Sequence, residues 1–146
     1  RVMCELICDG IHHRPVIARM AIDAAGTDRI CLVTDAMSAT GQGDGRYLLG
    51  ELEVEVRDGT ARLVTVDGTP GSIAGSTLTM ARAFGFVVGR VGLSIPEAAR
   101  IAATTPARWH GLEEVGTLEV GKRADICVVD DAGELQQVWR WGERIR

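Results

Sequence analysis

Residues 30–39 read ICLVTDAMSA, in which an apolar run ends in Thr34 and Asp35. A short, nearly continuous apolar run is typical of a strand that is covered on both faces. Residues 2–8, VMCELIC, form a similar run, and residues 15–26 between the two have the spacing of an amphipathic helix. Strand, helix and strand in this order predict a parallel sheet and therefore the α/β class.

The helix between the two strands has clear boundaries. Pro15 suits a first helical turn, where its missing N–H is harmless, and Gly26 is a natural stop. Five apolar residues recur at spacings of three and four and are expected to form its buried face: Val16, Ile17, Met20, Ala21 and Ala24.

The hydrophobic period changes at residues 47–66, YLLGELEVEVRDGTARLVTV. Apolar and acidic side chains alternate before the RDGT turn, and a second arm returns after it. This pattern predicts a β-hairpin with one solvent-exposed face, inserted at about 45–67.

Two more helices are expected after this hairpin. The first is capped by Ser76 and runs to about Val91. The second begins after Ser94, whose spacing to Glu97 is that of a capping box, and Pro106 starts a further short helical segment.

The last part of the chain, residues 112–146, is rich in strand and turn signals. We therefore expect two parts: strand and helix units with the inserted hairpin over residues 1–111, and a small β segment over 112–146.

Composition narrows the possible functions. The chain has 146 residues, of which 46% are hydrophobic and 25% charged, and its net charge of -4 comes from interspersed acids and bases. No basic block favours nucleic acid or an anionic membrane, and no apolar run approaches the roughly 20 residues of a membrane helix. We expect a cytoplasmic protein that acts on a small molecule. The four cysteines have no metal-ligand spacing and are expected to be reduced, mostly buried thiols.

Polar residues follow both predicted parallel strands. Asp35 comes directly after one strand, and Asp9 and His12 follow the other. The carboxyl ends of parallel strands meet at one edge, where ligands bind, so these side chains are candidates for a site. The alternative is that the two aspartates cap turns or helices.

The segment SIAGST, residues 72–77, is a third candidate. A loop of small residues that enters a helix exposes backbone N–H groups suited to a phosphate, a carboxylate or a polarised carbonyl. The alternative is a capped helix start. His110 lies at an expected helix end, where it is most simply a solvated or dipole-compensating residue.

The combined motifs resemble the N-acetylglucosamine-6-phosphate deacetylases of the amidohydrolase superfamily, over essentially the whole chain. The ending GTLEVGKRAD is typical of many amidohydrolases, whereas DGIH, TDA and AGST together point to the deacetylase branch. The segments that carry the resemblance are DGIHHRP (9–15), LVTDAMSATGQGDGRYLLG (32–50), GSIAGSTLTM (71–80), IPEAARIAATTPARWHGL (95–112) and GTLEVGKRADICVVD (116–130).

The resemblance implies the C-terminal part of a metal-dependent hydrolase, built as a (β/α)8 TIM barrel with part of a small β-sandwich. It implies hydrolysis of the acetamide of N-acetylglucosamine 6-phosphate to glucosamine 6-phosphate and acetate, in amino-sugar catabolism. Asp35 matches the family's catalytic aspartate, which takes a proton from a metal-activated water and hands it to the departing amine.

The resemblance also implies substrate-binding residues. Asp9, Gly10, Ile11 and His12 match the family's substrate loop, with His12 expected to contact the sugar phosphate. Neighbouring side chains on extended backbone point opposite ways, so His13 is not expected to share its ligand. The second loop that matches consists of Ile73, Ala74 and Gly75, which touch the substrate mainly through backbone groups.

The chain departs from the family pattern in its metal ligands. The family holds its divalent metal, for which zinc is the first candidate, with a Glu and histidines that lie upstream of Asp9. This chain is therefore expected to be an incomplete portion that holds no metal and is inactive alone, from a protein that forms a homodimer. The alternatives are a non-catalytic or truncated sugar-phosphate-binding module, and an amidohydrolase that acts on a different amide.

Overall fold

The computed structural model describes residues 2–146, which form two compact units. One unit combines the chain up to Val33 with Met80–Arg146, and the other is Thr34–Thr79. The division expected at residue 111 remains a prediction.

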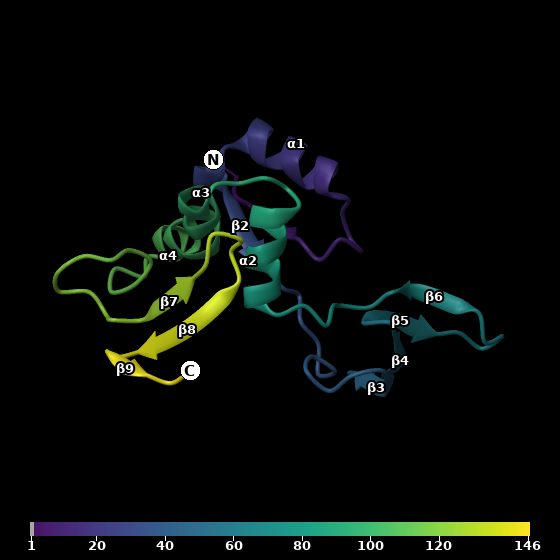
Figure 1. The fold of residues 1–146 in the computed structure, drawn as a ribbon. Coiled ribbons are helices and arrows are strands. Elements are labelled where there is room, and N and C mark those ends of the chain that lie inside the picture. The colour runs from purple at the N-terminus through teal and green to yellow at the C-terminus, as the bar shows by residue number, and fades with distance from the viewer. Residues whose placement is uncertain (1) are drawn as a thin grey trace. The chain divides into compact units, whose positions relative to one another are not determined.

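The first unit contains the parallel strand pair that the sequence predicted (Figure 1). Strand β1 (Cys4–Ile7) pairs with β2 (Ile30–Val33), and helix α1 (Pro15–Ala25) with the 3-10 turn η1 (Thr27–Arg29) connects them. Ile30, Cys31 and Leu32 are buried, as a strand covered on both faces requires. The α/β class is confirmed, whereas a closed barrel goes beyond the two parallel strands of residues 2–146.

The predicted buried face of α1 was wrong. Ala18 and Ile22 are buried, whereas Val16, Ile17 and Met20 are largely exposed. The helix is apolar on most of its surface, so helical spacing alone allows more than one buried face.

Four helical segments follow the second unit. They are α2 (Met80–Gly89), α3 (Ile95–Ala99), the π-helical η2 (Arg100–Thr104) and α4 (Thr105–Trp109). The capping box is confirmed, because Ser94 Oγ accepts a hydrogen bond from Glu97 N and Glu97 Oε2 accepts one from Ser94 N. The last three segments run on without a break. The π-turn precedes Pro106, which lacks the N–H that a regular helix needs.

The strand-rich C-terminal segment forms an antiparallel sheet. Its strands are β7 (Ile126–Val129), β8 (Leu135–Arg140) and β9 (Glu143–Arg144). The turn between β7 and β8 packs on α2, because a Cβ on Gly133 would lie 2.9 Å from Val88 Cβ.

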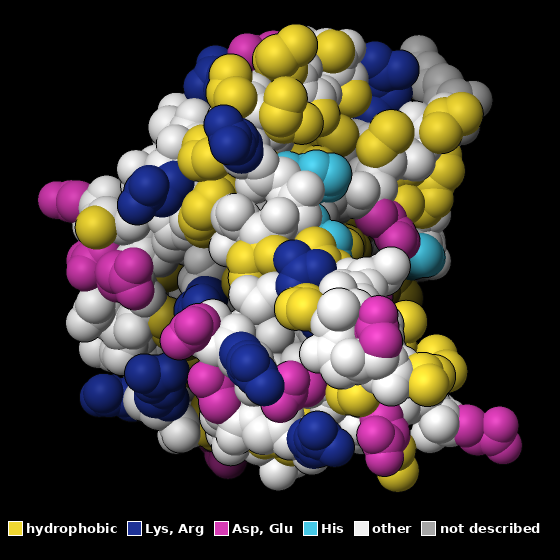
Figure 2. Space-filling view, turned by 90° about the vertical axis from the view of Figure 1, so that its right-hand side faces the viewer, with side chains coloured by type: hydrophobic (Ala, Val, Ile, Leu, Met, Phe, Trp, Pro, Cys, Tyr) yellow, Lys and Arg dark blue, Asp and Glu magenta, His cyan; other side chains and the backbone are white. Residues whose placement is uncertain are grey.

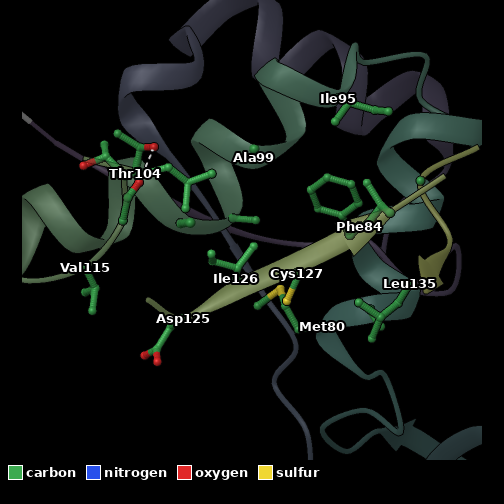
Figure 3. A pocket seen from close by; sticks show the side chains of 18 of the residues that line it. Met80, Phe84, Ile95, Ala99, Thr104, Val115, Asp125, Ile126, Cys127 and Leu135 are labelled. Atoms are coloured by element: carbon green, nitrogen blue, oxygen red, sulfur yellow. Dashed lines mark hydrogen bonds between the residues drawn. The ribbon is translucent and has the colours of Figure 1, made fainter. Parts of the chain in front are cut away.

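An apolar pocket of about 710 Å³ lies between this sheet and the helices (Figure 3). Phe84 and Ile95 line it from the helices, and Ile126 and Leu135 line it from the strands. Asp125 and Arg123, at its polar margin, are paired with each other. Its walls suit packing against apolar side chains better than they suit hydrolysis.

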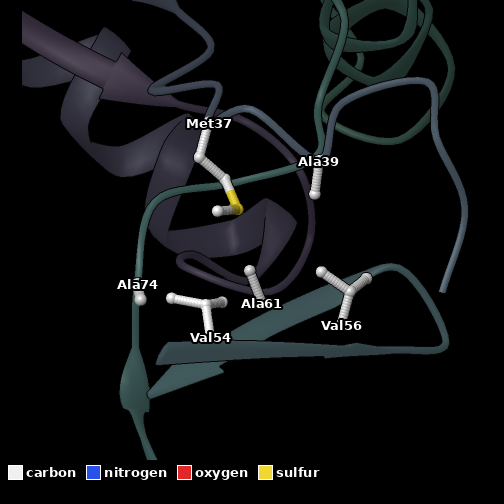
Figure 4. Close-up of a cluster of buried hydrophobic side chains, with 6 residues drawn as sticks. All are labelled: Met37, Ala39, Val54, Val56, Ala61 and Ala74. Carbon is white, nitrogen blue, oxygen red and sulfur yellow. The ribbon is translucent and has the colours of Figure 1, made fainter. Parts of the chain in front are cut away.

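The second unit holds four strands where the sequence predicted a two-stranded hairpin. They form one antiparallel sheet in chain order: β3 (Gly45–Leu49), β4 (Leu52–Arg57), β5 (Thr60–Val64) and β6 (Pro70–Ile73). Strand β6, PGSI, contains a proline and a glycine, which are uncommon inside strands, and the sequence pattern therefore did not predict it. Its sheet packs on the segment after β2 through a cluster of small and apolar side chains: Met37, Ala39, Val54, Val56, Ala61 and Ala74 (Figure 4).

Surface features match the mixed composition. Acidic, basic and apolar side chains are interspersed on the face in Figure 2. Within residues 2–146, the helices are all too short or too polar to cross a membrane. All four cysteines are free; Cys8 and Cys31 are buried as expected, but Cys4 and Cys127 are exposed.

Candidate functional site

The loop after β1 is organised around the side chain of Asp9. Asp9 Oδ1 accepts hydrogen bonds from Ile11 N and His12 N, both at 2.8 Å, and Asp9 Oδ2 lies 2.7 Å from His12 Nδ1. Because an ionised carboxylate can only accept, His12 Nδ1 carries the proton in this bond. The other ring nitrogen, Nε2, is thereby left for a ligand.

Asp9 is stabilised as an anion by its own loop. Burial alone raises the pKa of Asp9, but the hydrogen bonds from His12 N, the His12 ring and Ile11 N lower it further than burial raises it. The net pKa lies below the ordinary value. Both carboxylate oxygens are occupied within the loop, so the turn-capping alternative describes the Asp9 contacts, and Asp9 also orients His12.

Gly10 and the residues beside the loop fix its path. Gly10 has φ +79°, and a Cβ there would lie 3.0 Å from Phe86 Cε2 on α2. A side chain at this position would therefore strain the backbone and lie too close to the Phe86 ring. Cys8, directly before Asp9, is fully buried, and burial followed by the charge of Asp9 raises the pKa of its thiol to about 11. His13, the next residue after His12, is half-buried.

Asp35 lies two residues after β2 in an unusual conformation. Its side chain is exposed, and its φ is +50°, in the left-handed region that residues other than glycine rarely adopt. The Asp35 carbonyl oxygen accepts a hydrogen bond of 2.7 Å from Ser76 N. Strained residues of this kind cluster at functional sites, where the surrounding structure holds them in place.

The second predicted substrate loop lies against Asp35. Ile73 ends β6, and Ala74 N donates to Ala61 O at 3.0 Å. Gly75 has φ +64°, and a Cβ there would lie 3.2 Å from Asp35 O and 3.3 Å from Met37 Cβ. Glycine has no Cβ and adopts positive φ readily, so only glycine lets this loop come so close to Asp35 and Met37 without strain.

The structure therefore forms two clusters from the predicted residues. Asp9, Gly10, Ile11 and His12 make one loop of the first unit, whereas Asp35, Ile73, Ala74 and Gly75 lie in the second. Sequence reasoning missed Phe86, which supports Gly10, and the way Ser76 contacts Asp35. Ser76 was expected to cap a helix, but that helix begins only at Met80.

A divalent metal, which the family pattern implies, does not fit the residues that the structure describes. In the described range, 2–146, His, Cys, Asp and Glu side chains form no group of three or more that could hold a metal ion. The Asp9 carboxylate and the His12 ring are bonded to each other, and two ligands are too few for a zinc site.

Known proteins resemble this chain in sequence and in fold. A putative N-acetylgalactosamine-6-phosphate deacetylase of Escherichia coli K12 is 38% identical, over 98% of this chain and 83% of its own length. The N-acetylglucosamine-6-phosphate deacetylase of Vibrio furnissii is 36% identical, over 97% of this chain but 34% of its own length. This chain thus spans most of the first relative and about a third of the second.

A solved structure shows the same fold. It is an aspartate-to-alanine variant of N-acetyl-D-glucosamine-6-phosphate deacetylase from Mycobacterium smegmatis, in complex with N-acetyl-D-glucosamine 6-phosphate. The TM-score is 0.88 at 41% identity, over 98% of this chain and 37% of that one. The amidohydrolase family model also matches residues 3–145, and the chain therefore belongs to the amidohydrolase family.

Proposed function

We propose that this chain carries the proton-transfer carboxylate and the phosphate-binding loop of an N-acetylglucosamine-6-phosphate deacetylase. The reaction is hydrolysis of the acetamide, which yields glucosamine 6-phosphate and acetate. The observation that carries the proposal is Asp35, an exposed carboxylate with a positive φ two residues after the parallel strand β2.

Amide hydrolysis needs two proton movements, and one carboxylate can make both. As the water oxygen bonds to the acetyl carbon, Asp35 takes a proton from the water as general base. As the bond between the acetyl carbon and nitrogen breaks, Asp35 returns a proton to the nitrogen, so that the sugar leaves as a neutral amine. The second product is acetic acid, which ionises to acetate.

His12 supplies a donor for the sugar phosphate in this proposal. With Nδ1 bound to Asp9, a protonated His12 presents its Nε2–H to a phosphate oxygen. Charge-assisted hydrogen bonds of this kind distinguish a phosphorylated sugar from a neutral one. Ile73, Ala74 and Gly75 contribute backbone groups from the other loop.

Other parts of the complete gene product complete the proposed enzyme. The divalent metal, with zinc as first candidate, is held by residues outside this chain. The active form is a homodimer in the cytoplasm, the compartment of a phosphorylated sugar that is too polar to cross a membrane unaided.

One relative favours a second substrate. The E. coli K12 protein, of which this chain covers the larger share, bears the name of an N-acetylgalactosamine-6-phosphate deacetylase. That sugar carries the same acetamide and phosphate and differs at one hydroxyl.

The proposal is tested by acetate release from N-acetylglucosamine 6-phosphate, N-acetylgalactosamine 6-phosphate and unphosphorylated N-acetylglucosamine. The assay compares the isolated 146-residue chain with the complete gene product that contains it, after loading with zinc. We expect the complete protein to hydrolyse N-acetylglucosamine 6-phosphate best and the unphosphorylated sugar least, and the isolated chain to be inactive.

Each other result has a defined meaning. Preference for the galacto sugar would change the substrate but keep the chemistry. A folded, metal-loaded complete protein that binds the sugar phosphates without releasing acetate would be a non-catalytic module, and hydrolysis of other amides alone would place it elsewhere in the amidohydrolases.

A further inference from the structure

Ser76 is one of two buried polar residues within residues 2–146, with 4% of its surface exposed. A buried hydroxyl needs hydrogen-bond partners, and the choice of partners shows what the residue holds in place. Apart from one contact with Leu78 N at 3.1 Å, the partners of Ser76 all lie in the segment around Asp35.

The side chain of Ser76 fixes the peptide that precedes Asp35. Ser76 Oγ donates a hydrogen bond to Thr34 O. The Thr34 carbonyl belongs to the same rigid peptide plane as the Asp35 nitrogen, so this bond sets the orientation of that plane.

The backbone of Ser76 fixes the peptide that follows Asp35. Ser76 N donates to Asp35 O at 2.7 Å, and Met37 N donates to Ser76 O at 2.9 Å. These bonds form an isolated parallel bridge between Ala36 and Ser76. The two peptide planes on either side of the Asp35 Cα are therefore both bound by one residue.

Two fixed planes determine the backbone angles of the residue between them. Asp35 has φ +50°, in the left-handed region that Asp adopts more readily than most residues but less readily than glycine, and the bonds to both planes hold it there. Without the hydroxyl of Ser76, the plane before Asp35 loses this hydrogen bond and φ is free to relax. The direction of the exposed Asp35 carboxylate then changes, because the Cβ moves with the backbone.

We infer that Ser76 is a positioning residue for proton transfer by Asp35. This inference rests on the proposed deacetylase function. Proton transfer requires heavy atoms within about 2.6–3.2 Å, and misplacement by about 1 Å costs on the order of 100-fold in rate. A purely structural role for Ser76 would instead lower stability and leave the turnover of the folded protein unchanged.

The test compares the wild type, Ser76→Ala, Ser76→Thr and Ser38→Ala in the complete gene product, with N-acetylglucosamine 6-phosphate as substrate. Ser38 is the matched control, since it lies in the same segment, is exposed, and donates to a carbonyl, Leu48 O, at 3.2 Å. We expect Ser76→Ala to lower kcat by about 10- to 100-fold with KM within about threefold. Ser76→Thr, which keeps the hydroxyl, should restore most of kcat, and Ser38→Ala should match the wild type.

Amide hydrogen exchange over residues 34–37 gives a readout that does not need turnover. Ser76→Ala should raise exchange in this segment, whereas Ser38→Ala should not. If Ser76→Ala does not fold, Ser76→Cys keeps the side-chain volume with a weaker hydrogen bond and is expected to lose kcat in the same way.

The outcomes separate this inference from the proposed function. An active wild type whose Ser76→Ala variant keeps kcat would overturn the positioning role alone. A wild type that hydrolyses none of the amino-sugar phosphates would overturn the proposed function and the catalytic purpose of Ser76 together, even if exchange at residues 34–37 rises.

Discussion

Asp35 and His12 each follow a strand of the parallel pair, but the two side chains differ in exposure and in hydrogen bonding. Asp35 has an exposed carboxylate and a constrained backbone, which suits a group that must exchange protons. His12 is partly buried and has one ring nitrogen bound by Asp9, which fixes the direction of its other ring nitrogen. In the proposed function, Asp35 carries the proton and His12 binds the substrate.

Replacing His12 should weaken binding more than catalysis. We expect His12→Gln in the complete gene product to raise KM for N-acetylglucosamine 6-phosphate by about 10- to 100-fold, the effect of losing one hydrogen bond to a charged group. His110→Gln, at an exposed helix end, serves as the control and should keep the wild-type KM. Equal KM values for both variants, measured by acetate release, would remove His12 from the phosphate site.

The hydrogen bonds of Asp9 predict a pH-dependent stability. The pKa of Asp9 is lower in the folded state than the unfolded value of about 3.9, so its contribution is present above that pH. It is lost as the pH falls through the folded pKa. We expect Asp9→Asn to be less stable than the wild type by about 1–2 kcal/mol near pH 6, with the difference shrinking toward pH 3.

Urea unfolding of both proteins from pH 6 to pH 3 measures this difference. Asp131→Asn, an exposed acid in a turn, is the control and should follow the wild type throughout. A difference between Asp9→Asn and the wild type that stays constant with pH would show that Asp9 is not held as a stabilised anion.

Single residues also show which parts of the candidate site a sequence can and cannot predict. Asp35 is a candidate because a carboxylate directly after an apolar run is conspicuous, and Asp9 and His12 are candidates for the same reason. Ser76 was assigned a helix cap because serine before a helix usually caps it. Its actual partners lie about 40 residues earlier, and no local pattern reveals such a contact.

At the scale of elements, local signals were reliable where local physics decides the outcome. The capping box at Ser94, the Gly26 stop and the strand at Ile30–Val33 were all predicted and are present. The buried face of α1 and the strand β6 were not predicted correctly, because packing against distant elements selects them.

The capping box offers a test of element stability that should leave the chemistry intact. Ser94 is exposed and caps α3 through Glu97 N, while Glu97 caps Ser94 N in return. We expect Ser94→Ala to lower the free energy of unfolding by about 0.5–2 kcal/mol with kcat unchanged. Ser94→Asp, which can still cap, should stay close to the wild type in thermal unfolding, and equal stability of all three proteins would contradict the capping role.

At the scale of the whole molecule, the chain combines a βαβ unit, an inserted four-stranded sheet and a C-terminal three-stranded sheet. Several apolar surfaces remain uncovered, including the pocket beside β7 and the exposed face of α1. The chain matches about a third of the length of the longer relatives.

Proton transfer by Asp35 in hydrolysis of an amino-sugar phosphate is the role on which the proposed function depends. Its most direct test is kcat for acetate release from N-acetylglucosamine 6-phosphate, by the wild type and Asp35→Asn of the complete gene product, with bound metal and KM measured alongside. The proposed role of Asp35 predicts that Asp35→Asn lowers kcat by about 100- to 10,000-fold while metal content and KM stay near wild-type values. A variant that keeps kcat within about threefold of the wild type would contradict it.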